Sequence, residues 1–300
     1  MSSVAAGPGE RPGGIVGWWR SPWRKPRFLQ VLTMGYLAWS ILPVLIAILL
    51  SFNAGRSNTQ LQTLGLRWWI DDPDQQALFQ DPVIRRAILQ TLILSLATVL
   101  LAVPLGVSFA IGLDRWRGRL ANGANFMMIL TFVLPEITIG VAMLLVVQHL
   151  FNFIPLGTFA QIMGLVTFQI SYPVIIVRAR LLSIGKEYEE AGMDLGASPR
   201  QSVRRVLLPL LYPAIIASVA IVFADTVDNF VTVSYLDGPA DSQALSTFIY
   251  VTARASATPA VNAAATLMLL GTTTAIMMGY LLYKHLTRGQ KDAMSFSQQL

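Results

Sequence analysis

The chain contains no cysteine, few charges and little histidine. The lack of cysteine excludes disulfides, thiolate metal sites and cysteine nucleophiles, and only two histidines are present to build a histidine-rich metal site. Charged residues make up 13% of the 300 residues, whereas soluble domains carry about 25%. So few charges cannot cover a water-facing surface of this size. The sequence therefore predicts an integral membrane protein.

Long apolar runs are abundant, and hydrophobic residues form 54% of the chain. A bilayer core about 30 Å thick requires about 20 apolar residues per helix. Windows of that length occur at residues 28–52, 86–113, 122–150, 158–182, 210–235 and 261–283. Continuous runs of this kind exclude a β-barrel, whose strands alternate apolar and polar residues. The expected fold class is an all-α integral membrane protein with six transmembrane helices.

Basic residues are unevenly distributed between the two sides of these windows. If successive windows cross in alternate directions, 17 of the 22 Lys and Arg residues fall on one side. The others are Arg56, Arg67, Arg85, Arg86 and Arg254. The positive-inside rule then places both termini in the cytoplasm. The net charge of +6 is explained by this topology, so we expect contact with membrane lipid and no binding of nucleic acid.

The chain is expected to consist of five parts. Residues 1–27 form a cytoplasmic tail with an interfacial segment, 28–52 the first transmembrane helix and 53–85 an extracytoplasmic loop. Residues 86–284 form a five-helix core with a long cytoplasmic connection at 184–209, and 285–300 form a cytoplasmic tail. In the outer loop, Trp68 and Trp69 are interpreted as interfacial anchors, with contact to an external partner as the alternative.

The connection at 184–209 is longer than a tight turn and predicts two short helices with a break. Three acids would suit the positive end of the first helix dipole: Glu187, Glu189 and Glu190. Gly196 would end this helix, because glycine enters the left-handed conformation at low cost. A capping-box pattern would begin the second helix: Ser198, Pro199 and Gln201.

Ala191 and Leu195 lie four residues apart beside these acids, so they would be exposed on one face of the first helix. The resulting two-helix elbow is then either a docking knob for a cytoplasmic partner or a well-capped surface loop. The chemistry of the residues alone leaves both interpretations open.

The elbow is similar to the EAA loop of ABC-importer permeases, in which Glu-Ala-Ala is followed by Gly and an Ile-x-Leu-Pro ending. The residues at the corresponding positions are Glu190, Ala191, Gly192, Gly196, Val206, Leu207, Leu208 and Pro209. Gly192 replaces the second Ala, which weakens the first helix by about 1 kcal/mol, and Val206 replaces Ile. The resemblance implies that this segment, together with Leu195, couples the chain to an ATPase.

Other segments resemble permeases of spermidine/putrescine importers. They are Ser51-Phe52-Asn53, Leu66-Arg67-Trp68-Trp69, Asp228-Asn229-Phe230-Val231, Gly238-Pro239 and Thr258-Pro259-Ala260-Val261-Asn262-Ala263. That family usually has Asp-Asp where this chain has Asp228-Asn229. The resemblance implies the MetI-like transmembrane domain of a type I ABC importer in a bacterial cytoplasmic (inner) membrane. The expected function is a permease subunit that moves a small organic cation, a polyamine, by alternating access.

The same resemblance implies a complex with two cytoplasmic ATP-binding subunits, a second permease that is identical or homologous, and an extracytoplasmic solute-binding protein. The chain itself has no Gly-x-x-x-x-Gly-Lys-Ser/Thr, since Gly185-Lys186 is followed by Glu187. We therefore expect no cofactor here, with ATP and Mg bound by the partners, and no enzymatic activity of this chain.

Three acids lie inside the apolar windows: Glu136, Asp225 and Asp228. A charge near the bilayer centre costs about 2.5–3.5 kcal/mol, so such residues usually face the bundle interior or a wet cavity. The last two, with Asn229 and Thr232, would form a polar stripe on one helix, and Glu136 follows Pro135, which favours a kink. The acids and Asn229 either line a path for a cationic solute or join helices by hydrogen bonds.

Alternatives remain open from the sequence. An ABC permease for another amine or an amino-acid-like solute would agree with Asn229. An ion-coupled secondary transporter would use the three acids as proton or sodium sites, although no internal repeat favours it. A scaffold or assembly factor would explain the elbow but not the acids.

Overall fold

The computed structural model describes residues 27–57, 60–115, 118–239, 241–255 and 258–297. The chain divides into two compact units, residues 1–47 and 48–300. Helix α2 (Arg27–Ser51) begins in the first unit, and it is long and apolar enough to cross a membrane, as predicted for 28–52. The rest of the predicted tail at 1–27 lies outside the described residues.

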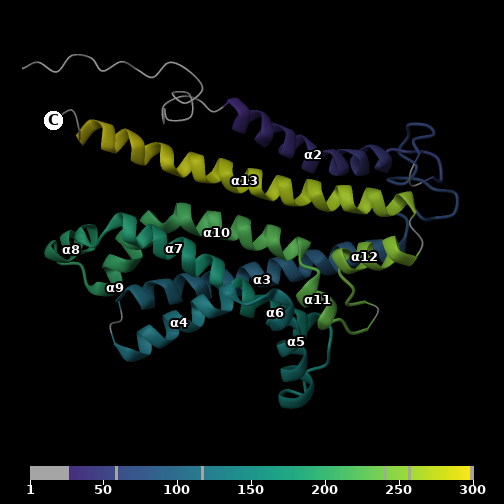
Figure 1. Cartoon of the computed structure of the whole chain (residues 1–300). Helices are drawn as coiled ribbons and strands as arrows, with labels where there is room; N and C mark the ends of the chain where they lie inside the picture. Colours follow the sequence, from purple (N-terminus) through teal and green to yellow (C-terminus); the bar gives the residue numbers. More distant parts are fainter. Residues whose placement is uncertain (1–26, 58–59, 116–117, 240, 256–257, 298–300) are drawn as a thin grey trace, which may run out of the picture. The chain divides into compact units, whose positions relative to one another are not determined.

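After the loop at 52–81, the second unit consists of helices. They are α3 (Pro82–Arg115), α4 (Arg119–Val133), α5 (Glu136–Leu145), η1 (Val146–Leu150), α6 (Thr158–Gln169), α7 (Ser171–Ile184), α8 (Glu187–Asp194), α9 (Pro199–Ser202), η2 (Val203–Leu207), α10 (Leu208–Asp228), α11 (Val231–Tyr235), α12 (Leu245–Ala255) and α13 (Pro259–Ser297). Figure 1 shows α8 and α9 at one end of α3 and α10, and α12 at the opposite end. We call these the α8 end and the α12 end.

Helices α3, α7 and α10 form the core of this unit, and α13 packs on α10. Glycine allows the closest of these approaches. A methyl group on Gly106 would lie 2.4 Å from Cγ of Pro173, and one on Gly279 would lie 2.5 Å from Cβ of Ala220. Small residues therefore bring α3 against α7 and α13 against α10, as is usual for helices that pack inside a membrane.

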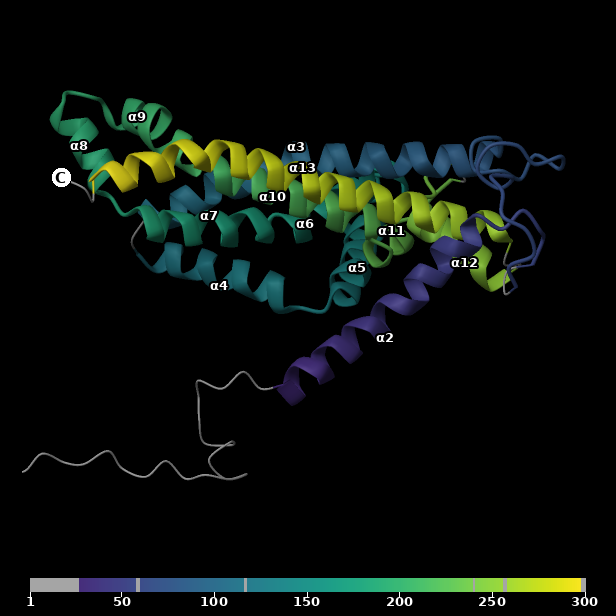
Figure 2. The same ribbon diagram turned by 90° about the horizontal axis from the view of Figure 1, so that it is seen from above.

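The predicted third span at 122–150 is wrong as a single helix. Its two halves, α4 and α5 continued by η1, are bent by 108° at Leu134 and Pro135. Leu134 is extended (φ −62°, ψ 138°), because a residue before proline avoids the helical region, and Pro135 lacks the amide hydrogen that would continue the ladder. Figures 1 and 2 show α5 leaving the direction of α4. The kink expected at Pro135 is therefore a full break.

The predicted fifth span at 210–235 is also divided. A continuous helix of 30 residues runs from Pro199 to Asp228, and the short α11 follows it. Asn229 between them is extended (φ −65°, ψ 109°), and its side-chain Oδ1 accepts a hydrogen bond from the amide of Thr232 at 3.2 Å. Local bonding of this kind lets asparagine compete with helix formation. The polar stripe expected on one helix is thus spread over a helix end, a break and α11.

Two further elements differ from expectation. Helix α12 falls between the predicted fifth and sixth spans, where no helix was expected. Helix α13 runs to Ser297 without a boundary near 284. The predicted tail at 285–300 is therefore helical in its described part, and residues 298–300 lie outside the described residues.

The loop between α2 and α3 is held together by buried polar groups. Asn53 is fully buried, and its side-chain amide donates to the carbonyls of Ser57 and Gln60 at 2.8 and 2.9 Å. Trp68 is buried, and its Nε1 donates to the Gly55 carbonyl at 2.9 Å. Both interpretations of Trp68, as an interfacial anchor and as a partner contact, are wrong, because its ring packs inside the loop with Leu78.

We expect low pH to destabilise the loop between α2 and α3 by protonating Asp72. Its carboxylate is fully buried and accepts a hydrogen bond from Nε of Arg67 at 2.6 Å. Burial opposes ionisation, but bonds from Arg67 and from the Gln76 amide, with the Arg67 charge, outweigh it and hold the pKa of Asp72 below its usual 3.8. Because the pKa of Asp72 is lower in the folded loop than in the unfolded chain, ionised Asp72 stabilises the fold at pH values above its unfolded pKa. This stability is lost as the pH falls through the pKa of the folded state. We expect hydrogen exchange of residues 66–81, corrected for intrinsic rates, to accelerate below about pH 3.8.

The variant Asp72→Asn should show this faster exchange already at neutral pH and no further acid step. Asp74→Asn is the matched control, because Asp74 pairs with Arg56 at an exposed site. Protection in the wild type that persists unchanged to pH 2.5 would contradict the role of Asp72.

Candidate functional site

The elbow at 184–209 has the local structure that its sequence predicts. All three glutamates lie in the first turn of α8, and Gly196 follows the helix with φ +90°. The capping box is present: Oγ of Ser198 accepts from the Gln201 amide at 3.4 Å, and Oε1 of Gln201 accepts from the Ser198 amide at 2.9 Å. The second helix then continues through η2 into α10, and Pro209 lies in the first turn of α10 within this continuous stretch.

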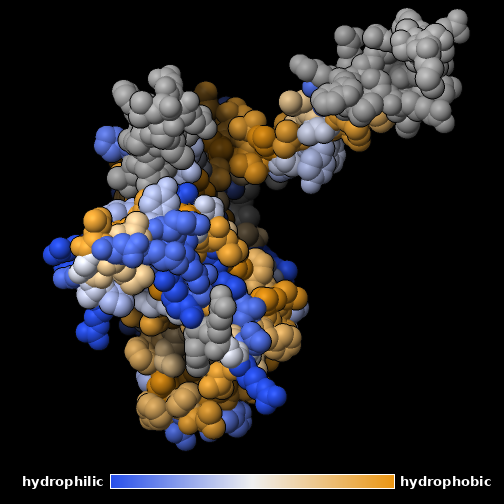
Figure 3. Space-filling view, turned by 90° about the vertical axis from the view of Figure 1, so that its left-hand side faces the viewer, coloured by the Kyte–Doolittle hydropathy of each residue, from blue (hydrophilic) through white to orange (hydrophobic). Residues whose placement is uncertain are grey.

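The elbow presents apolar side chains at its surface. Leu195 is 91% exposed, Tyr188 and Met193 are exposed, and so are Ala191 and Glu190. Figure 3 shows the α8 end as a mixture of hydrophilic and hydrophobic surface. Exposed apolar residues among charges are typical of an interaction site. This surface agrees with the docking interpretation, which stays a prediction.

The inner side of the elbow is packed. Gly192 faces the turn that follows α9, where an added methyl group would lie 3.4 Å from Cγ2 of Val206, an ordinary contact. Leu207 is fully buried, and Val206 and Leu208 are partly buried. The alanine of the EAA pattern would therefore fit at Gly192.

An ion pair that sequence reasoning did not identify fastens the elbow to the core. Glu189 is buried, with its side chain 5% exposed, and it pairs with Arg115 at the end of α3. The hydroxyl of Ser202 donates to the Glu189 carbonyl at 3.2 Å. Helix α8 is thus bound both to α3 and to the beginning of the helix that leads into α10.

The acids and Asn229 predicted inside the membrane gather around the break between α10 and α11. Glu136 is the first residue of α5, and its Oε1 accepts hydrogen bonds from the side-chain amide of Asn229 and, at 3.2 Å, from the hydroxyl of Thr232. The structure therefore joins α5 to α11 through Glu136, as the hydrogen-bond interpretation predicts for this residue.

The two aspartates of α10 differ in their surroundings. Asp225 is half-buried and accepts hydrogen bonds from Nε2 of Gln169 at 2.6 Å and from the Tyr172 hydroxyl at 3.3 Å. Asp228 is exposed at the last position of α10 and has no hydrogen bond or ion pair with a described residue. Of the three acids, Asp228 is the most exposed, and it is the one without a hydrogen bond to a described residue.

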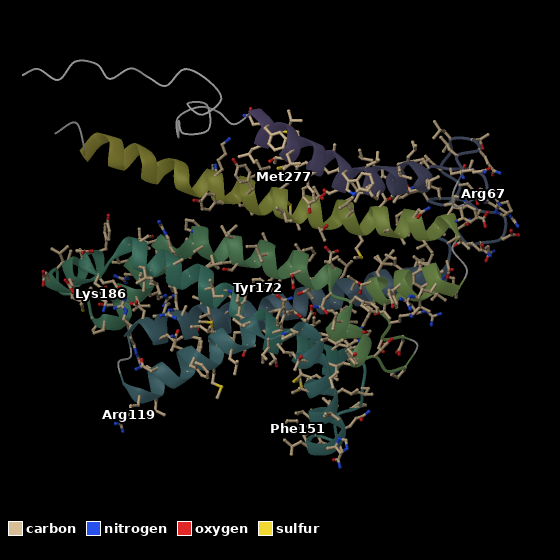
Figure 4. All side chains as sticks on the ribbon, viewed as in Figure 1. Arg67, Arg119, Phe151, Tyr172, Lys186 and Met277 are labelled. Atoms are coloured by element: carbon tan, nitrogen blue, oxygen red, sulfur yellow. The ribbon has the colours of Figure 1, made fainter. Side chains whose placement is uncertain are left out.

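Polar residues of α6 and α7 complete this region. Gln169 is fully buried, and its Oε1 has no hydrogen-bond partner. Tyr172, at the beginning of α7, is labelled among the helices in Figure 4, between Lys186 toward the α8 end and Arg67 in the loop at the other. The sequence alone did not single out Gln169 or Tyr172. A polar amide or phenol inside an apolar window indicates a site that faces other helices, just as an acid there does.

A second buried network lies nearer the α12 end. Oε1 of Gln161 accepts from Nε2 of Gln90 at 2.9 Å, and Nε2 of Gln161 donates to the carbonyl of Ser242 at 3.1 Å. This network joins α3, α6 and the segment before α12. It connects helices that surround the break.

The acids near the break carry no basic partner among the described residues. No Lys or Arg of the described chain pairs with Glu136, Asp225 or Asp228. No group of three or more His, Asp or Glu side chains among the described residues could hold a metal ion. An unpaired carboxylate at a helix end attracts positive charge, so the charges at the break agree with the predicted path for a cationic solute, which stays a prediction.

Comparison with known proteins gives matches along most of the chain. The model of the family described as "Binding-protein-dependent transport system inner membrane component" matches residues 102–292. The putrescine transport system permease protein PotI of Escherichia coli (strain K12) is 29% identical over 255 residues, which cover 83% of this chain and 86% of that protein. The spermidine/putrescine transport system permease protein PotC of the same strain is 27% identical over 252 residues, 84% of this chain and 92% of that protein.

Solved structures share the fold. A bacterial ABC transporter involved in the import of the acidic polysaccharide alginate has a TM-score of 0.69 at 17% identity, over 87% of this chain and 96% of that chain. The MetNI methionine ABC transporter, in an inward facing conformation, has a TM-score of 0.59 at 19% identity, over 69% of this chain and 97% of that chain. The helical arrangement is therefore that of the transmembrane domains of ABC importers.

Proposed function

The chain belongs to the family of binding-protein-dependent transport system inner membrane components, and we propose that it is the permease subunit of an ATP-driven importer for a polyamine such as putrescine or spermidine. The observation that carries the solute class is the similarity to two polyamine permeases over more than four fifths of the chain. Asp228 adds chemical support, because an exposed carboxylate without a partner suits an ammonium-bearing solute.

In this proposal the chain works inside a larger complex. Two cytoplasmic ATP-binding subunits hold ATP and Mg, a second permease, identical or homologous, completes the membrane part, and an extracytoplasmic solute-binding protein delivers the polyamine. The excess of basic residues at the α8 end supports cytoplasmic termini. The elbow then faces the ATP-binding subunits, and Glu190, Ala191 and Leu195 are the residues of α8 and its end that would contact them.

One rigid element connects the elbow to the break. The helix from Pro199 to Asp228 has 30 residues, which at 1.5 Å per residue span about 45 Å. Closure of the ATP-binding subunits would move α8, and α9 and η2 would transfer that movement along this helix to Asp228. Alternating access then needs no chemistry on this chain, because the free energy comes from hydrolysis on its partners.

The test is ATP hydrolysis by the assembled complex in proteoliposomes. Solute-binding protein loaded with putrescine or spermidine should stimulate hydrolysis and drive uptake, whereas protein loaded with an amino acid should not. Stimulation only by a non-amine solute would refute the polyamine assignment. Uptake that continues without ATP and without the ATP-binding subunits would refute the ATP-driven mechanism in favour of coupling to an ion gradient.

A further inference from the structure

Helix α12 rests on the break between α10 and α11. The hydroxyl of Ser246 donates to the carbonyl of Asn229 at 2.8 Å. Four residues later, the ring of Tyr250 lies against the ring of Phe230, with their centroids 4.3 Å apart. Since residues four apart share a helix face, α12 presents one face to Asn229 and Phe230. Phe230, one member of the aromatic pair, lies two residues after Asp228.

The next residue on that face is a cation. Arg254 lies four residues beyond Tyr250, and its Cζ is 4.5 Å from the centroid of the Tyr250 ring. No carboxylate of the described chain forms an ion pair with Arg254. By contrast Arg67, which also lies over an aromatic ring, is paired with Asp72. Arg254 therefore contacts the face of an aromatic ring and not a carboxylate of the described chain.

Tyr250 lies at the surface of the described chain. Tyr250 is 41% exposed, and both Arg254 and Asp228 are exposed. An aromatic face holds an organic ammonium group as it holds a guanidinium, with similar strength. The guanidinium of Arg254 thus occupies a position that an ammonium group of the solute could take. Phe230, which packs against the same ring, lies two residues after Asp228, whose carboxylate has no partner among the described residues.

We propose that Tyr250 and Phe230 form a binding site for an ammonium group of the solute, and that Arg254 occupies this site until the solute displaces it. The inference rests on the proposed function, because the ligand class is that of its solute. Because Arg254 competes with the solute, the apparent affinity for the solute falls in proportion to the fraction of time for which Arg254 fills the site. Weak binding of this kind suits a permease, since a solute held tightly on the path would leave it slowly.

The test is equilibrium binding of radiolabelled putrescine to the full complex in nanodiscs without the solute-binding protein. Tyr250→Leu, which removes the ring face, should weaken binding about threefold to tenfold, and Tyr250→Phe should bind as the wild type does. Arg254→Gln should tighten binding by a similar factor. When Tyr250→Leu is already present, adding Arg254→Gln should change putrescine binding little. Without the ring, Arg254 and putrescine no longer compete for the same site.

General charge repulsion would give a different pattern. Arg254→Gln would then tighten binding equally with and without the ring. Arg86→Gln, which removes an exposed charge at the beginning of α3, would do the same. Either result overturns the proposal, as does unchanged binding by Tyr250→Leu, or a wild-type complex that binds no putrescine and gains no binding from Arg254→Gln. Stimulation of ATP hydrolysis by putrescine-loaded binding protein is measured on the same samples, and its absence for every amine would refute the proposed function instead.

Discussion

Asp228→Asn is expected to lower polyamine uptake at least tenfold while the protein still folds and assembles. Asp228 is exposed at the end of α10 and makes no hydrogen bond with a described residue, so an amide of the same size removes no internal contact. It does remove the negative charge that an ammonium group would meet at the break. A tenfold loss corresponds to about 1.4 kcal/mol, which is within the range of one charge-assisted contact.

The measurement is uptake in proteoliposomes beside the thermal stability of the same samples. Asp241→Asn is the matched control, because Asp241 is an exposed acid in the segment before α12. Asp225→Asn should behave differently and lower stability, since its carboxylate accepts bonds from Gln169 and Tyr172. Normal uptake by Asp228→Asn, Asp225→Asn and Glu136→Gln variants that fold would exclude a path lined by these acids.

Arg115→Glu is expected to abolish most of the stimulation of ATP hydrolysis by loaded binding protein. The substitution places a like charge against Glu189, whose side chain is 5% exposed. Removing one partner of a buried pair costs about 3–5 kcal/mol, and the partial exposure of Arg115 favours the lower end. Helix α8 would then separate from α3, and its movement would no longer follow that of the core. We expect stimulation to fall about tenfold or more while basal hydrolysis remains.

Exchange of the two charges separates this role from a general loss of stability. The double variant Arg115→Glu with Glu189→Arg should recover part of the stimulation, because the pair can form in the opposite sense. Recovery will be incomplete, since Asp114 lies 3.4 Å from Arg115 and would repel a glutamate there. Arg119→Glu, at the exposed start of α4, is the control. A double variant that assembles but is as inactive as Arg115→Glu would contradict the coupling role.

Local chemistry predicted the parts of the fold that depend on neighbours in sequence. The elbow is the best example: Gly196 takes the left-handed conformation, and Ser198 and Gln201 form the capping box. Long apolar windows likewise predicted the helices, because lipid requires backbone groups to bond within their own segment. The exposed Leu195 followed from its spacing alone.

Breaks inside apolar windows could not be predicted from hydropathy. Leu134 and Asn229 are extended for local reasons, a following proline and a side-chain bond to the Thr232 amide. Such a break persists only where other elements satisfy the freed groups. The Asn229 carbonyl accepts from Ser246 on α12, a contact across 17 residues that no local pattern reports.

Long-range pairing explains the remaining differences. Trp68 is buried because its indole reaches the Gly55 carbonyl across 13 residues. Glu189 pairs with Arg115, which is 74 residues away in the sequence, and Asp225 accepts a hydrogen bond from Gln169, which is 56 residues away. The sequence shows that these polar residues lie among apolar ones, and only the packing of α3, α6, α7 and α10 decides their partners.

The hydrogen bond between Asn229 and Glu136 ties the evolution of two distant positions together. The amide of Asn229 donates to the Glu136 carboxylate, which an ionised aspartate at 229 cannot do. An Asn229→Asp change toward the family's usual acid pair would set two like charges in contact, so it becomes tolerable only after Glu136 is replaced by a neutral residue or a donor. The two positions are therefore coupled, and an acid at 229 is expected only beside a neutral residue or a donor at 136.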